Sequence, residues 1–169
     1  MNRSIDVLII GAGASGLMCA LTAGYRGRQV LLLEHTKKVG RKILMSGGGR
    51  CNFTHLDSTP ANFLSSNPHF CKSALSRYRP QDFVDMVDRH GIAYHEKTPG
   101  QLFCDESSRD ILAMLKTECD WAGVTIETET TVDKVTKHDD SFSVSTSRGV
   151  ITCQSLVIAT GGLSIPNGG

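Results

Sequence analysis

The sequence predicts an α/β fold in which a parallel sheet with crossing helices is joined to a three-stranded antiparallel meander. Residues 5–34 read as a buried strand, a glycine turn, a helix and a second strand. Residues 107–127 read as a helix followed by a further strand, as in a βαβ unit. Residues 130–153 alternate apolar and polar side chains across two turns, as antiparallel strands do. This order of elements is typical of a doubly wound sheet.

The first element is a run of branched apolar residues over 5–10, which is followed at once by the motif Gly-Ala-Gly-Ala-Ser-Gly. Gly11 allows a tight turn, Gly13 lets the backbone approach a pyrophosphate, and Gly16 lets the next helix pack closely on the strand. Gly27 stands where a left-handed residue would end that helix. The N-terminal amides of this helix are expected to point at the pyrophosphate.

The second strand, residues 29–33, ends at Glu34, eighteen positions after Gly16. A carboxylate at this distance can accept hydrogen bonds from the hydroxyls of an unphosphorylated adenosine ribose, and it would repel a 2'-phosphate. Glycine-rich loops are common for structural reasons, but here the strand, the helix and the acid all have the expected spacing. The stretch predicts a dinucleotide site, and FAD and NAD share this fingerprint.

The later strands complete the predicted sheet. Residues 124–127 are expected to form the third parallel strand, with a crossover helix over 107–122 before them. The meander is expected over 130–137, 141–146 and 150–153, with turns at Asp139-Asp140 and Arg148-Gly149. A separate apolar strand over 155–159 then runs into Thr160-Gly161-Gly162, where the glycines permit a second close approach to the pyrophosphate.

Residues 37–54 are basic and rich in glycine. They hold five cations and the triplet Gly47-Gly48-Gly49. The amides of such a turn can form an anion-binding nest, while Ser46, Asn52 and Thr54 offer donors and acceptors suited to ribityl hydroxyls or ring edges. The alternative is a solvated, flexible basic loop, because three adjacent glycines also describe a linker.

Composition limits the class of protein. A chain of 169 residues with 40% hydrophobic content can bury one core and a small appendage, and its net charge of +1 indicates no general affinity for polyanions. No apolar run reaches the roughly 20 residues of a membrane span, and the first four residues are too few for a signal peptide. The six cysteines and six histidines lack metal-ligand spacing. We expect a cytoplasmic protein with reduced thiols, no metal and no membrane association.

Three blocks resemble a known family. DVLIIGAGASGLMCA, GRKILMSGGGRCNFTH and LVIATGGLSIP are together similar to the bacterial BaiN-like, or RdsA-like, NAD(P)/FAD-dependent oxidoreductases. The middle block distinguishes this family from other flavoproteins. Its members are longer, so the chain resembles their N-terminal part. The resemblance implies a FAD-binding domain of the glutathione-reductase type, and it favours FAD over NAD.

The resemblance also implies that the backbone near Thr131 and Val132 lies beside the adenine. Together with the motifs above, it assigns cofactor binding to Gly11, Gly13, Ala14, Ser15, Gly16, Glu34, His35, Arg41, Lys42, Ser46, Gly47, Gly48, Gly49, Arg50, Cys51, Asn52, Thr131, Val132, Ala159, Thr160, Gly161 and Gly162.

The domain expected over residues 1–169 is the N-terminal portion of a FAD-binding domain with a helical insertion at about 55–104. Helices are expected at 69–78 and 81–90, and a hairpin is expected from 92–96 and 101–104. The chain departs from the family after Pro166, so we expect a truncated protein without the substrate domain and the returning flavin segment. Such a chain is expected to be inactive alone and prone to self-association.

The function that the resemblance implies is NAD(P)H-driven reduction of an activated C=C bond, in an enone of a small molecule or in a uracil of RNA. No catalytic residue is assigned. Cys51 is a candidate proton donor, and the alternative is a buried structural thiol. Two other hypotheses remain: a dinucleotide-binding module without turnover, and an NAD-dependent dehydrogenase in which the glycine triplet is only a loop.

Overall fold

The computed structural model describes residues 3–162, and these divide into two compact units. The first unit comprises Met1–Ile43 and Leu115–Gly169, and the second comprises Leu44–Met114. The predicted departure from the family after Pro166 lies outside the described residues. Each unit is described by itself below.

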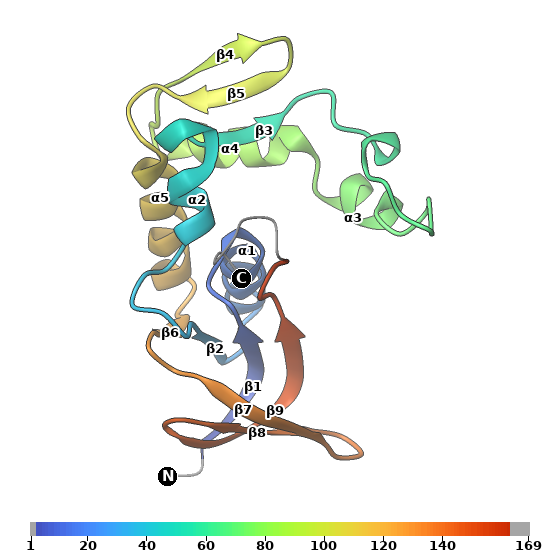
Figure 1. The fold of residues 1–169 in the computed structure, drawn as a ribbon, viewed down its shortest axis with the longest axis vertical. Coiled ribbons are helices and arrows are strands. Elements are labelled where there is room, and N and C mark those ends of the chain that lie inside the picture. Colours follow the sequence, from blue (N-terminus) through green and yellow to red (C-terminus); the bar gives the residue numbers. More distant parts are fainter. Residues whose placement is uncertain (1–2, 163–169) are drawn as a thin grey trace. The chain divides into compact units, whose positions relative to one another are not determined.

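A six-stranded sheet with the order β6-β2-β1-β9-β8-β7 forms the first unit (Figure 1). Its strands are β1 (Arg3–Ile10), β2 (Val30–Leu33), β6 (Thr125–Glu127), β7 (Val132–Lys137), β8 (Phe142–Thr146) and β9 (Gly149–Ile158). The pairs β6–β2, β2–β1 and β1–β9 are parallel, whereas β9–β8 and β8–β7 are antiparallel. The predicted α/β fold with a parallel sheet and a three-stranded meander is confirmed.

The central strands are apolar because both of their faces are covered. Leu8, Leu31 and Leu33 join Val144 and Ile151 of the meander in one buried cluster. On the alternate positions, Ile9 and Leu32 are fully buried. A β-carbon at Gly16 of the following helix would lie 3.4 Å from the Leu32 side chain, so this helix packs on the opposite face.

Helix α1 (Ala14–Tyr25) and the C-terminal part of α5 (Ser108–Trp121) lie against one another. Gly24 permits this approach, because a β-carbon there would be 2.5 Å from the carbonyl oxygen of Ala122. The Tyr25 hydroxyl donates to Glu118 at 2.5 Å, and the Cys119 thiol, which is fully buried, lies 3.6 Å from the Leu17 carbonyl oxygen. The two helices therefore share one packed interface beside the sheet.

The end of the sheet differs from the sequence prediction. The separate strands expected at 150–153 and 155–159 are one continuous strand, β9. Its first half pairs with β8, while β1 pairs along it from Ile151 to Ile158. Gln154 and Ser155 are exposed polar residues within this strand, and the chain makes no turn at them. The break between two strands that was expected there was wrong.

The second unit contains a three-stranded antiparallel sheet with the order β3-β5-β4. Its elements are the end of α2 (Arg41–Met45), the 3-10 helices η1 (Ser46–Gly49) and η2 (Pro60–Asn62), β3 (Asn52–His55), α3 (Lys72–Arg77), α4 (Pro80–Arg89), β4 (Tyr94–Thr98), β5 (Gln101–Cys104) and the start of α5. The two helices and the hairpin expected in this region are present, with bounds that differ by a few residues. Strand β3, which adds to the hairpin, was not predicted.

Candidate functional site

Three neighbouring parallel strands of the first unit end at the same edge of the sheet. Strand β1 ends before Gly11, β2 ends before Glu34, and β9 ends before Ala159. The register places Ile10 beside Leu33 on one side and Ile158 on the other, so the three strand ends are level. Ligands of open α/β sheets bind beyond the carboxyl ends of such strands, where successive connections leave in opposite directions.

The glycine loop is tied to both neighbouring strands by its backbone. The Gly11 amide donates to the Leu33 carbonyl at 2.8 Å, and the Ala159 amide donates to the Ile10 carbonyl at 2.8 Å. Gly11 has φ +105°, and a β-carbon there would lie 2.5 Å from the Ala159 carbonyl oxygen. A β-carbon at Gly16 would lie 1.9 Å from the Gly11 carbonyl oxygen. Both glycines are therefore required by the packing of the loop itself.

Gly13 has a different environment. Its backbone has φ −86°, which any residue adopts, and a β-carbon there would meet nothing within 4 Å. It precedes α1, whose N-terminus has no side-chain cap and no acidic residue in its first turn. Ala14 and Ser15 are exposed. This end of α1 presents amide donors and a positive dipole end at the sheet edge, as a phosphate group requires.

Glu34 is 9% exposed, and its carboxylate braces the glycine loop against the segment after β2. Oε2 accepts a hydrogen bond from the Ala12 amide at 3.1 Å, and Oε1 accepts from the Thr36 amide and hydroxyl, both at 2.9 Å. A carboxylate offers about four acceptor positions, so one position on Oε2 is left for a ligand hydroxyl. His35 is exposed and lies with Nδ1 3.2 Å from Oε1.

Thr131 and Val132 begin the meander beside Glu34. The Thr130 amide donates to the Glu34 carbonyl at 3.0 Å, and the Thr131 carbonyl accepts from the Ser147 amide at 3.0 Å. Thr131 is exposed and Val132 is half-buried. This segment therefore lies next to the backbone of the acid that was predicted to hold the ribose.

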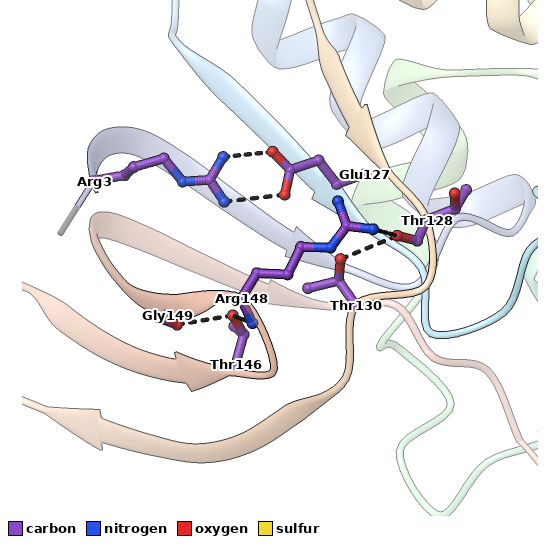
Figure 2. Close-up of polar contacts among 7 residues, drawn as sticks. All are labelled: Arg3, Glu127, Thr128, Thr130, Thr146, Arg148 and Gly149. Atoms are coloured by element: carbon purple, nitrogen blue, oxygen red, sulfur yellow. Dashed lines mark hydrogen bonds and ion pairs between the residues drawn. The ribbon is translucent and has the colours of Figure 1, made fainter. Parts of the chain in front are cut away.

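Figure 2 shows the polar network around residues 128–131, which connect β6 to β7. Arg3 and Glu127 form two parallel hydrogen bonds, one of them at 3.0 Å. The Arg148 guanidinium donates to the Thr128 carbonyl at 2.8 Å, and the Thr130 hydroxyl donates to the same oxygen at 3.1 Å. Hydrogen bonding to Arg3 lowers the pKa of Glu127, and the charge of Arg148 adds to this effect. The network fixes the segment that leads into Thr131.

A second glycine turn follows β9, and Lys42 contacts it. The Lys42 ammonium donates to the Gly162 carbonyl at 2.6 Å, and a β-carbon at Gly161 would lie 3.2 Å from the same nitrogen. The Gly40 amide donates to the Ala12 carbonyl at 2.8 Å, which brings the start of the basic segment to the glycine loop. Arg41 and Thr160 are exposed. The first unit thus gathers the predicted residues from 11–16, 34–35, 41–42, 131–132 and 159–162 at one edge of its sheet.

The predicted residues 46–52 belong to the second unit. Gly47, Gly48 and Gly49 have φ of +58°, +65° and +90°, so three successive residues are left-handed. A β-carbon at Gly47 would lie 2.7 Å from the Asn52 amide nitrogen and 3.0 Å from the Phe103 ring, whereas Gly48 and Gly49 face open space. The triplet is therefore an ordered turn against β5 that leaves open space beside Gly48 and Gly49.

Cys51 is 6% exposed and has φ +49°. Burial raises the pKa of its thiol, which therefore stays protonated at neutral pH. Cys104 is fully buried, and burial raises its pKa to about 12. The low exposure of Cys51 fits the structural-thiol alternative, and its protonated state fits a proton donor.

Two residues of this site were not identified in the sequence. The Ala12 amide and Thr36 both bind the Glu34 carboxylate. A threonine two positions after an acid can cap it locally, and this spacing was the available signal for Thr36. The Ala12 contact joins residues 22 positions apart and has no local signal.

The arrangement fits a dinucleotide. Its features are an empty space at Gly13, an uncapped helix N-terminus, a buried carboxylate with one acceptor position left, and a cation at the second glycine turn. Within residues 3–162, no His, Cys, Asp and Glu side chains form a group of three or more that could hold a metal ion. No helix in this range is long and apolar enough to span a membrane.

Comparison with known proteins identifies relatives along the whole chain. A model of the HI0933-like protein Rossmann domain matches residues 5–169. The ribosomal RNA dihydrouridine synthase of Escherichia coli is 55% identical over 95% of this chain, and 3-dehydro-bile acid delta(4,6)-reductase of Clostridium scindens is 26% identical over 96%. The chain covers 40% and 39% of these two proteins, so it spans about two fifths of their length.

Solved structures show the same fold at low identity. The crystal structure of glycine oxidase from Geobacillus kaustophilus superposes with a TM-score of 0.66 and 19% sequence identity. The match covers 94% of this chain and 56% of that one. The similarity supports the Rossmann-type fold and gives no information on the substrate.

Proposed function

Because the chain belongs to the family of the HI0933-like protein Rossmann domain, we propose that it is the FAD-binding part of a flavin-dependent oxidoreductase that reduces an activated C=C bond. The observation that carries this proposal is the 55% identity over 95% of the chain to a ribosomal RNA dihydrouridine synthase. The dinucleotide geometry at the three strand ends supports the cofactor independently. The domain extent, residues 1–169 with an insertion at about 55–104, belongs to the same proposal.

We propose a uracil of RNA as the substrate. Dihydrouridine differs from uridine by two hydrogens across one ring double bond, which is conjugated to a carbonyl and thus activated. The relative named for this product is 55% identical, whereas the relative named for a bile-acid reduction is 26% identical. An enone of a small molecule is the second candidate, because that relative is still similar over 96% of the chain.

The residues of the first unit would hold FAD in the following way. The amides of Ala14 and Ser15, with the open space at Gly13, would receive the pyrophosphate. The remaining acceptor position of Glu34 would bind a ribose hydroxyl, and the backbone near Thr131 would lie beside the adenine. Lys42 would hold the second glycine turn close to the phosphates.

When bound, the flavin supplies hydride transfer to one carbon of the double bond. The other carbon needs a proton. Cys51 is a candidate in this chain, because burial keeps its thiol protonated, and the alternative is a buried structural thiol. The contacts with FAD that the sequence predicts for residues 46–52 belong to the same proposal.

NAD(P)H is the proposed electron donor. A test purifies the full-length protein, identifies the cofactor extracted from one portion, and adds NADPH to the intact remainder without oxygen. We expect the bound cofactor to be FAD. NADPH should bleach it, and a uridine-containing RNA should restore its colour. Recovery with an enone alone would favour the second candidate. Absence of flavin, with NAD bound instead, would support a dehydrogenase, and FAD without any reduction would support a binding module.

A further inference from the structure

The segment of residues 58–81 in the second unit exposes large apolar side chains. Leu64 is 95% exposed, Phe70 is 55% exposed and Phe63 is 42% exposed. Every residue from 61 to 70 is exposed. Within the second unit, Figure 1 shows α3 apart from the strands β3, β5 and β4. Such a concentration of exposed apolar residues marks an interaction surface.

Local hydrogen bonds hold this segment in shape. The Thr59 amide donates to the Asn62 side chain at 2.8 Å, and the His69 amide donates to the Asn67 side chain at 3.0 Å. Cys71 is 7% exposed and anchors the segment near Pro60, with its sulfur 3.9 Å from the Pro60 carbonyl oxygen. The aromatic side chains are therefore presented by a defined backbone.

The charge of the segment differs from that of the rest of the chain. The 58–81 segment contains none of the seventeen acidic residues and three of the eighteen basic ones. Lys72 and Arg77 are exposed on α3, and Arg79 is exposed and paired with Asp82 at 3.4 Å. Since the whole chain has a net charge of +1, the remainder is slightly acidic. Because it lacks acidic residues, the segment carries a local net charge of +3 where the aromatic side chains are exposed.

We propose that the 58–81 segment is a docking surface for single-stranded RNA, with Phe63 and Phe70 stacking on bases and Lys72 and Arg77 contacting phosphates. Exposed aromatic side chains together with nearby cations are the combination that binds single strands, because stacking is tolerant of sequence and the cations neutralise the backbone. The inference rests on the proposed function in one respect, that the substrate base belongs to an RNA. A base that is to be reduced must leave its stack, and a surface that stacks its neighbours lowers the free-energy cost of that step.

The test uses the full-length protein with its FAD and a fluorescein-labelled, uridine-containing, single-stranded RNA. Two double variants probe the surface: Phe63→Ala with Phe70→Ala, and Lys72→Glu with Arg77→Glu. Matched controls lie in the first unit: Trp121→Ala removes a ring that is 67% exposed, and Lys134→Glu with Lys137→Glu reverses two exposed charges. Anisotropy gives the affinity at several salt concentrations, and flavin absorption and thermal melting report the state of each variant.

We expect the aromatic double variant to bind RNA at least about tenfold more weakly. The charge-reversal variant should bind more weakly at low salt, and the slope of log affinity against log salt should fall in magnitude by about 1.4. The controls should retain the wild-type affinity. Ultraviolet crosslinking of wild-type protein to a bromouridine-containing RNA should label peptides within 58–81, and this readout does not depend on any variant folding.

Equal affinity of wild type and both double variants would overturn the proposal, as would crosslinks that lie only elsewhere. A lower melting temperature of the aromatic variant with unchanged RNA affinity would show that another part of the full-length protein covers the surface, which also overturns it. Weaker RNA binding by the double variants without any reduction of uridine would support the docking surface while contradicting the proposed function. Reduction of an enone by a protein that does not bind RNA would contradict both the docking surface and the RNA substrate, and it would support only the reduction of an activated C=C bond.

Discussion

At the scale of single residues, Glu34 connects the two loops that would hold the cofactor. Its carboxylate accepts hydrogen bonds from the Ala12 amide in the glycine loop and from Thr36 after β2. The carboxylate thus has a structural role in the absence of a ligand. The hydrogen bonds that it accepts from Ala12 and Thr36 fix its position. A preorganised acceptor loses little conformational entropy when a ribose hydroxyl binds.

Replacing Glu34 should weaken FAD binding in a graded way. Glu34→Ala removes the brace and the acceptor, and it should lower affinity roughly 10- to 150-fold, as expected for a charged hydrogen bond. Glu34→Gln keeps one acceptor oxygen but turns an amide donor towards either Ala12 or Thr36. Its loss of FAD affinity should therefore be smaller than that of Glu34→Ala. Thr36→Val is the control, because it removes one donor and leaves the carboxylate. Flavin titration measures all three, and equal affinities would contradict the assignment of Glu34.

Gly13 and Gly16 should separate ligand binding from folding. Gly13→Val adds a side chain into open space at an ordinary φ, so the melting temperature of the apoprotein should change little. The same side chain occupies the expected place of the pyrophosphate, and FAD affinity should fall by about 100-fold or more, or about 2.7 kcal/mol.

Gly16→Ala should have the opposite effect, because its β-carbon would overlap the Gly11 carbonyl. We expect a loss of about 3 kcal/mol in the free energy of unfolding. Melting of the apoproteins and flavin titration check both variants. If Gly13→Val kept full affinity for FAD, the pyrophosphate would have to lie elsewhere.

At the scale of elements, the crossing from β6 to β7 depends on the ion pair of Arg3 and Glu127 (Figure 2). The Glu127 side chain is 17% exposed and the Arg3 side chain is 40% exposed, so solvent screens the pair in part. The folded-state pKa of Glu127 is lowered, which means that its contribution to stability is present above the unfolded-state pKa. This contribution is lost as the pH falls through the folded-state value.

Glu127→Gln should therefore destabilise the protein by about 1 kcal/mol at neutral pH. The difference from wild type should shrink as the pH falls below about 4.5, the ordinary value for this group. Denaturant unfolding across this pH range measures the difference. Lys134→Gln, on the exposed face of β7, is the control and should leave the pH dependence unchanged. A difference that did not depend on pH would show that Glu127 acts by packing alone.

The sequence was informative where structure depends on local pattern. The stretch 5–34 has its strand, turn and helix within a few residues of one another, and it was predicted with its three glycine positions. Strand β3 was missed because its pairing with β5 joins Asn52 to Phe103, a contact without any local signal. The break predicted in β9 was wrong because the polar pair Gln154 and Ser155 is exposed within one strand.

Some residues of the candidate site could likewise be predicted from local sequence, whereas others could not. Gly11 and Glu34 were predicted from their place directly after a strand, and Gly16 was predicted from its place in the helix after the glycine turn. The role of Gly47 against Phe103 and the Ala12 contact of Glu34 require the folded chain. The family resemblance drawn from the three sequence blocks is confirmed by the match to residues 5–169.

At the scale of the whole molecule, the 169-residue chain expressed alone should turn over far more slowly than a family-length protein. The chain spans about two fifths of its curated relatives, and a flavin held by this portion alone would be open to water and oxygen. We expect loosely bound FAD, rapid reoxidation in air and some self-association, measured by flavin content, oxygen consumption and size-exclusion chromatography. Comparable anaerobic turnover by both proteins would contradict this prediction.

The most direct measurement is anaerobic single turnover of the full-length protein with a uridine-containing RNA, followed by nucleoside analysis of the product. The flavin of the protein is first reduced with NADPH, and the Gly13→Val variant is treated in parallel. We predict one dihydrouridine formed per reduced FAD in the wild-type protein and none above background in the variant. Reduced flavin that persists while the RNA stays unchanged would contradict RNA reduction, and dihydrouridine formed equally by Gly13→Val would contradict the FAD site at the three strand ends.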